Sequence, residues 1–264
     1  MIVRQSLADV PAGERSVALG SFDAVHLGHR AVIGAAVATA NERGLRSAVL
    51  TFHPPPIAVL RPEVKLVQLS SLSRRAALVA ELEADELVIV RFDREFAQLE
   101  ADEFASRVLA QTLGARHVSV GENFHYGRGA KGNPAKLAEE GLRLGFDVHA
   151  EPLLELGGAP ISSSRVRALV AAGAVEEAAA LLGRPPWLEG AVRRGDGRGR
   201  AVRALADHRK TRRQGLDAVA VTHPDRDLLA GGETVKKLTW LSDSQHGPSV
   251  LTMVRRDDLA PQQQ

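Results

Sequence analysis

Short apolar runs alternate with longer amphipathic stretches over the first 186 residues of the chain. The apolar runs predict five strands, at residues 16–22, 47–52, 86–92, 117–120 and 147–154. The stretches between them have helical periodicity and predict helices at residues 27–43, 72–83, 102–113 and 134–144. Strands that are apolar throughout are typical of a parallel sheet covered on both faces. The alternation therefore predicts a doubly wound α/β domain, whose ligands bind beyond the carboxyl ends of the strands.

Two more helices are predicted at residues 163–172 and 175–182, each followed by a glycine, Gly173 and Gly183, that can end it. Pro185-Pro186 then interrupts the pattern. Beyond it, short β-like pieces recur at 218–222 and 250–254, and residues 193–213 carry nine Lys or Arg against two Asp. We therefore expect two domains, 1–186 and 187–264, the second a small and degenerate β-type region that is partly disordered.

Composition narrows the class of protein. The 264 residues include no cysteine, which excludes a disulfide scaffold, thiolate catalysis and cysteine-ligated zinc. Lys and Arg number 34 against 32 Asp and Glu, so the pI of about 9.2 does not indicate a nucleic-acid binder. No apolar run approaches the roughly 20 residues of a membrane span, and the amino terminus lacks the apolar core of a signal peptide. We expect a cytoplasmic protein without a membrane partner.

Two histidines lie where the first predicted strand passes into the first long helix. His26 and His29 are three residues apart with Gly28 between them, so both rings face one site at the helix start. Free backbone N–H groups and the positive end of the helix dipole favour an anion there, and Gly28 allows a close approach. The segment holds no obvious nucleophile, which favours direct displacement. The alternative is a chance pairing among nine histidines.

A second polar group opens the helix predicted at residue 163. Ser162, Ser163 and Ser164 are followed by Arg165 and Arg167. One interpretation is a well-capped helix, because serine is favoured at the N-cap. The other is a triphosphate site made of backbone N–H groups, hydroxyls and a guanidinium. The residues alone leave both open.

Two loops follow the ends of strands. Residues 121–127, with Asn123 and Phe124, precede a basic glycine-rich stretch at 128–133, and residues 52–56 form a rigid proline loop that can line a pocket. Each could equally be an ordinary connection.

In order, the four segments 20–29, 52–56, 121–127 and 161–167 resemble the adenylyltransferase module of prokaryotic FAD synthetases, the bifunctional riboflavin kinase/FMN adenylyltransferases. The resemblance covers about residues 15–200. It implies the Rossmann-like fold of the HxGH nucleotidyltransferases, and a reaction in which ATP, with Mg²⁺, and FMN give FAD and pyrophosphate.

The resemblance also implies roles for individual residues, and it places no metal ligand on the chain. The implied catalytic residues are His26, His29 and Arg167. The implied ATP contacts are Gly20, Ser21, Phe22, Asp23, Gly28, Ser162, Ser163, Ser164 and Arg165, and the implied flavin contacts are Pro54, Pro56, Asn123 and Phe124.

Three positions depart from the family's usual residues. Ala24 stands in place of glycine, which would add strain of about 1 kcal/mol if that position needs a positive φ. Pro55 stands in place of histidine in the proline loop, which would reshape the flavin side of the site. Ser164 stands in place of threonine and keeps the hydroxyl.

The carboxyl-terminal region matches the kinase module poorly. Residues 182–190 and 195–200 resemble the start of that module, but residues 201–208 replace its proline–threonine–asparagine loop. We expect a chain that makes FAD from FMN and has lost riboflavin kinase activity. The alternatives are an enzyme with both activities and a non-catalytic nucleotide-binding relic that uses residues 193–213 on nucleic acid. The sequence does not give the oligomeric state.

Overall fold

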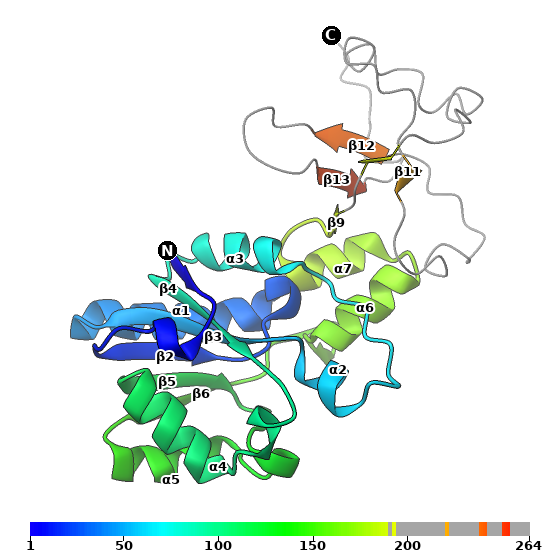
Figure 1. The fold of residues 1–264 in the computed structure, drawn as a ribbon. Coiled ribbons are helices and arrows are strands. Elements are labelled where there is room, and N and C mark those ends of the chain that lie inside the picture. Colours follow the sequence, from blue (N-terminus) through cyan, green and yellow to red (C-terminus); the bar gives the residue numbers. More distant parts are fainter. Residues whose placement is uncertain (190–191, 194–219, 222–237, 242–249, 254–264) are drawn as a thin grey trace, which may run out of the picture. The chain divides into compact units, whose positions relative to one another are not determined.

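The computed structural model describes residues 1–189, 192–193, 220–221, 238–241 and 250–253. Packing divides the chain into two compact units: residues 1–167 with 181–183, and residues 168–180 with 184–264. The first unit is built around a parallel sheet (Figure 1).

The sheet has six strands in the order β1-β4-β3-β2-β5-β6, and all neighbouring pairs are parallel. The chain moves outward from β2 through β3 to β4, and then returns to the other side of β2 for β5 and β6. The order therefore reverses between β2 and β5, where open α/β sheets bind ligands. The strands are β1 (Ile2–Arg4), β2 (Arg15–Leu19), β3 (Arg46–His53), β4 (Glu86–Arg91), β5 (Ala115–Gly121) and β6 (Asp147–Glu151).

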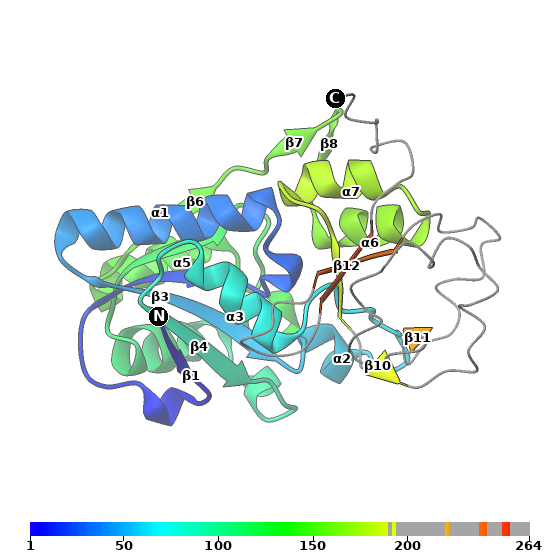
Figure 2. The same ribbon diagram turned by 90° about the horizontal axis from the view of Figure 1, so that it is seen from above.

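Helices cover both faces of the sheet, as the pattern predicted. Figures 1 and 2 show α1 and α3 on one face, and α4, its π-helical continuation η4, and α5 on the other. The main helices are α1 (Leu27–Arg43), α2 (Pro56–Leu60), α3 (Leu72–Ala80), α4 (Ala101–Glu103), η4 (Phe104–Thr112), α5 (Pro134–Leu144), α6 (Ser163–Ala171) and α7 (Val175–Leu182). Short 3-10 turns are η1 (Leu7–Asp9), η2 (Asp23–Val25), η3 (Phe96–Gln98) and η5 (Arg128–Ala130), and β7 (Glu155–Leu156) pairs with β8 (Ala159–Pro160).

The central strands carry apolar runs because each one serves two cores. In β2, Val17 and Leu19 pack against η4 and α5, while Ala18 packs against α1 and α3. The same alternation runs through β3 and β4. Successive side chains of a strand point to opposite faces, so a strand buried on both faces favours apolar residues at consecutive positions.

The predicted and observed elements differ mainly at their ends. The helices predicted at 27–43, 134–144 and 175–182 have those bounds in the structure, and Gly173 and Gly183 adopt the positive φ of 74° and 67° expected of glycines that end a helix. The first predicted strand ends at Leu19 rather than residue 22, because Phe22 already has a φ of 48°. β1 and α2 were not predicted from the sequence pattern.

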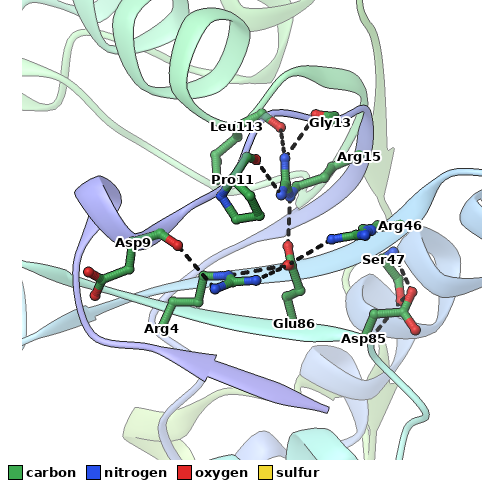
Figure 3. A network of polar contacts seen from close by, with 10 residues as sticks. All are labelled: Arg4, Asp9, Pro11, Gly13, Arg15, Arg46, Ser47, Asp85, Glu86 and Leu113. Atoms are coloured by element: carbon green, nitrogen blue, oxygen red, sulfur yellow. Dashed lines mark hydrogen bonds and ion pairs between the residues drawn. The ribbon is translucent and has the colours of Figure 1, made fainter.

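A buried ion network lies where β2, β3 and β4 begin (Figure 3). Glu86, with a side chain 1% exposed, accepts from Arg15 Nε at 2.6 Å and Arg4 Nη2 at 2.8 Å, and Arg46 Nη1 lies 3.7 Å away. The fully buried Arg15 also donates to the backbone carbonyls of residues 11, 13 and 113. One carboxylate thus ties four strands together.

The second unit contains short antiparallel pairings. β12 (Leu238–Leu241), β13 (Val250–Met253) and β9 (Trp187–Glu189) form a three-stranded sheet, and β10 (Val192–Arg193) pairs with β11 (Ala220–Val221). The β-like pieces predicted at 218–222 and 250–254 overlap β11 and β13. The boundary at residue 186 stays a prediction. Residues 194–213 of the basic stretch and residues 201–208 lie outside the described residues. Among the described helices, none combines the length and the apolar character needed to cross a bilayer.

Candidate active site

The turn after β2 has an unusual backbone. Phe22, Ala24 and Val25 all have positive φ, at 48°, 66° and 44°. The Ala24 N–H donates to Ser70 Oγ at 3.0 Å, which holds the turn against the segment before α3. This backbone brings His26 to the N-cap of α1.

The positive φ of Ala24 fulfils the condition under which alanine adds strain. Ala24→Gly should therefore leave the free energy of unfolding unchanged or raise it by up to about 1 kcal/mol. Ala36→Gly is the matched control, because this buried alanine lies inside α1; it should lower the free energy by about 1 kcal/mol or more. Urea titration of both variants checks this, and equal losses in the two would contradict it.

His26 and His29 form a stacked pair at the start of α1. Their ring centroids are 3.6 Å apart with 18° between the planes, and the Phe22 and His29 rings meet in a T-shaped arrangement with centroids 5.3 Å apart. His26 Nδ1 accepts from the His29 backbone N–H at 3.3 Å and so caps the helix. Because Nδ1 accepts, the neutral His26 ring carries its proton on Nε2.

The surroundings of His29 disfavour a positive charge. Burial lowers the pKa of His29 well below its usual 6.5, and the nearby His26, Arg75 and Arg167 lower it further. Its Nδ1 is buried and has no hydrogen-bond partner in the described structure. His29 is therefore neutral at pH 7.

The Asp23 carboxylate accepts hydrogen bonds from several groups around the histidines. Its Oδ1 accepts from the Ser70 backbone N–H and hydroxyl, both at 3.0 Å, and both carboxylate oxygens accept from the Leu69 N–H. Oδ2 receives Arg167 Nη2 at 2.6 Å, and Arg75 Nη2 lies 3.6 Å from Oδ1. Both oxygens of this buried carboxylate are thus engaged by protein donors. The ATP contact predicted for Asp23 stays a prediction.

Arg167 is brought to the histidines by α6. Besides its bond to Asp23, it donates from Nε to the Val67 carbonyl at 2.7 Å, and within the described residues its Nη1 has no hydrogen bond. Ser163 Oγ donates to the Asp23 carbonyl at 3.1 Å, which joins the start of α6 to the turn after β2. The structure thus brings the predicted residues His26, His29 and Arg167 together.

Ser162 and Arg165, at the start of α6, make structural contacts within the protein. Ser162 Oγ accepts from the Arg165 N–H at 3.2 Å, as expected of an N-cap, whereas Ser164 is exposed. The Arg165 side chain turns away to the carbonyls of Leu156 and Ala159, at 2.8 and 2.7 Å. These bonds hold Arg165 on the β7–β8 pair. Its predicted ATP contact is not tested by them.

Gly20 and Gly28 lie close against aromatic rings of the same turn, which the sequence did not reveal. A Cβ on Gly28 would lie 3.3 Å from His26 Cε1, and one on Gly20 would lie 3.0 Å from the Phe22 ring. Gly28 thus makes room for the His26 ring itself. Ser21 is exposed, and its carbonyl accepts from Thr51 Oγ1 at 2.9 Å.

The predicted flavin residues lie on loops after β3 and β5. The His53–Pro54 peptide bond is cis, and Pro56 opens α2. Asn123 is exposed, and Phe124 stacks on Tyr126 with centroids 5.8 Å apart. The parallel register of β2, β3 and β5 puts these loops and the histidine turn at the same edge of the sheet.

Sequence reasoning missed Arg75, Ser70 and the Val67 carbonyl. Arg75 could have been found, because it lies three and four residues before the buried Leu78 and Val79 and so falls on the apolar stripe of α3. A charged residue on such a stripe is an unusual buried polar group. Ser70 and Val67 act through backbone or hydroxyl contacts in a loop and leave no pattern.

Comparisons with known proteins agree on the first unit. A sequence model described as FAD synthetase matches residues 10–165. A bifunctional riboflavin kinase/FMN adenylyltransferase of Escherichia coli (strain K12) is 33% identical over 197 residues, which cover 75% of this chain and 63% of that protein. Its counterpart in Listeria monocytogenes is 38% identical over 189 residues, covering 70% and 59%.

A solved structure is also similar to the chain. It is described as a macrolide-efflux protein from Streptococcus pneumoniae, and matches with a TM-score of 0.68 and 27% identity over 77% of this chain and 66% of that one. The chain spans about 63% of the length of the Escherichia coli relative.

Proposed function

The chain belongs to the FAD synthetase family, and on that premise we propose that it transfers AMP from ATP to FMN, giving FAD and pyrophosphate. The observation that carries the proposal is the convergence of His26, His29 and Arg167 at the start of α1, beside the point where the strand order reverses. Free N–H groups of the first helical turn and the positive end of the dipole add to an anion site there.

The proposed reaction is a single displacement at phosphorus. An oxygen of the FMN phosphate attacks the α-phosphorus of ATP, the new P–O bond forms, and the bond to the pyrophosphate oxygen breaks. Negative charge grows on the leaving pyrophosphate. Groups that are already in place can stabilise this charge without reorganising, and no covalent intermediate with the protein is needed.

We assign complementary roles to the three site residues. Arg167 is held at Nε and Nη2 by Val67 and Asp23, which leaves Nη1 to bind a phosphate oxygen. The neutral His29 offers an N–H donor rather than a fixed charge, and the His26 ring, whose Nδ1 accepts from the backbone, carries an N–H at Nε2.

We propose that Mg²⁺ enters as part of the ATP substrate. The Asp23 carboxylate beside the histidines already accepts from several protein donors. Within the described part of the chain, no three His, Cys, Asp or Glu side chains gather in an arrangement that could hold a metal ion.

We place FMN on the loops after β3 and β5, where Pro54, Pro56, Asn123 and Phe124 lie. The half-buried Phe124 offers an aromatic face and Asn123 an exposed amide. We also keep the predicted division into an adenylyltransferase region, residues 1–186, and a kinase remnant, residues 187–264.

Incubation with ATP, Mg²⁺ and either FMN or riboflavin tests the proposal. We expect FAD from FMN, detected by chromatography, and no FMN from riboflavin, because residues 201–208 lack the kinase loop that would hold a metal at the phosphates. FMN left unconverted at high enzyme concentration would show that the proposed activity is wrong. FMN formed from riboflavin, with host kinase excluded, would favour a chain with both activities.

A further inference from the structure

Arg75 is a buried cation beneath the candidate active site. Its side chain, on α3, is 1% exposed. Nη1 donates to Thr51 Oγ1 at 3.3 Å, and Nη2 lies 3.6 Å from Asp23 Oδ1. Thr51 in turn donates to the Ser21 carbonyl. The Arg75 side chain therefore supports the turn after β2 at two points, directly at the Asp23 side chain and through Thr51 at the Ser21 backbone.

The pairing of Arg75 is incomplete for so buried a group. Its Nε is buried without a hydrogen-bond partner in the described structure, and its partner Asp23 is shared with Arg167 at the shorter distance of 2.6 Å. A buried guanidinium that is not fully paired costs stability, and an apolar side chain of similar size would cost less. Buried polar groups that break this rule are expected at functional sites.

The arrangement concentrates positive charge where phosphates would bind. Two guanidinium groups share one carboxylate, so Arg75, Arg167 and Asp23 together leave an excess positive charge beside the histidines. The groups facing His29 are His26 at the N-cap of α1, Arg75 on α3, and Arg167 on α6, with Asp23 between the arginines. The two arginines both lower the pKa of His29.

From this geometry we propose that Arg75 is a positioning residue for adenylyl transfer. It fixes Asp23, which in turn orients Arg167, and its buried charge adds positive potential at the polyphosphate. The proposal rests on the proposed function. Arg75 itself lies too deep to touch the substrate and acts through Asp23 and His29.

The test compares Arg75→Met with Arg74→Met, which removes the same charge one position earlier on α3. In Arg75→Met, kcat/KM for ATP should fall by about 10- to 100-fold, the scale on which supporting residues act through the groups they orient. NMR titration of the His29 ring should show its pKa shifted upward, because a nearby positive charge has been removed. Thermal unfolding should show a folded protein.

Arg75→Lys separates charge from geometry. It keeps the charge, so the His29 titration should stay near that of the parent chain, while kcat/KM for ATP should still fall, because one ammonium cannot reach Thr51 and Asp23 together. An Arg75→Met variant that matches Arg74→Met in both titration and kcat/KM would overturn the proposal. If Arg75→Met does not fold, an undiminished kcat/KM in Arg75→Lys would overturn it.

The His29 titration needs no substrate, so it separates this proposal from the proposed function. If the parent chain makes no FAD while Arg75→Met still shifts the titration, the adenylyl transfer is wrong and the electrostatic link from Arg75 to His29 holds. The dissociation constant for ATP then replaces kcat/KM, and an unchanged value in Arg75→Met would overturn the role of Arg75 at the polyphosphate.

Discussion

Glu86→Gln should lower the free energy of unfolding by about 3–5 kcal/mol, the cost of removing one partner from a buried ion pair. Arg15 would stay fully buried with its charge no longer compensated, while its bonds to backbone carbonyls remain. The free energy of unfolding of a whole domain is about 5–15 kcal/mol, so this loss is a large fraction of it. Urea titration of the two proteins measures the effect.

Glu14→Gln is the control for this change. It breaks the ion pair between Glu14 and Arg116, in which both side chains are about half exposed. The free energy of unfolding should fall by less than about 1 kcal/mol. Comparable losses in the two variants would show that the Glu86 network contributes no more than a surface pair.

The same network predicts a pH dependence of stability. Burial raises the pKa of Glu86, but the hydrogen bonds and charges of Arg15 and Arg4 together lower it by more. The pKa therefore lies below its usual value of 4.5. Because the unfolded chain binds the proton more readily, the contribution is present above about pH 4.5 and is lost as the pH falls through the lower, folded value. The decline should be smaller in Glu86→Gln.

The second large effect is on turnover. His29→Ala should lower kcat for FAD formation about 100-fold, the scale of losing one donor to the transition state. The affinity for FMN should change little, because the residue lies at the helix start proposed for the phosphates of ATP. Steady-state kinetics and quenching of FMN fluorescence on binding measure the two quantities separately.

His149→Ala is the matched control, since this exposed histidine on β6 pairs with Glu151. Its kcat should equal that of the parent chain. A His29→Ala protein with normal turnover but weak FMN affinity would place His29 on the flavin side of the site instead.

The fold was predictable where the sequence pattern and the packing agree. The strands of the central sheet face two cores and so give apolar runs, and α1 has a long periodicity that ends before Gly44, which has a φ of 66°. β1 was not predicted, because three residues at an exposed edge carry no periodicity. The ends of β2 and α3 were misplaced, because Phe22 and Glu83 adopt a positive φ that their residue types rarely take.

The candidate site was predictable as a set of segments but not as a network. The spacing of His26 and His29 on one helix start placed both rings in one site. That Asp23 faces two arginines, and that Arg165 turns to the β7–β8 carbonyls while Arg167 turns inward, depends on which loops meet in space. A motif read along the chain carries no information on that.

Stability and the proposed catalytic function depend on opposite ends of the sheet, although substitutions that change function usually lower stability. The charges that anchor the strands lie where β2, β3 and β4 begin, and the candidate chemistry follows where β2 and β3 end. Five to eight residues of strand, at about 3.3 Å each, separate them. Substitutions that far apart act additively. A library of variants confined to the loops after β3 and β5 can therefore be screened for new acceptor molecules. Such substitutions leave the Glu86 network intact, and its stability offsets the stability that they cost.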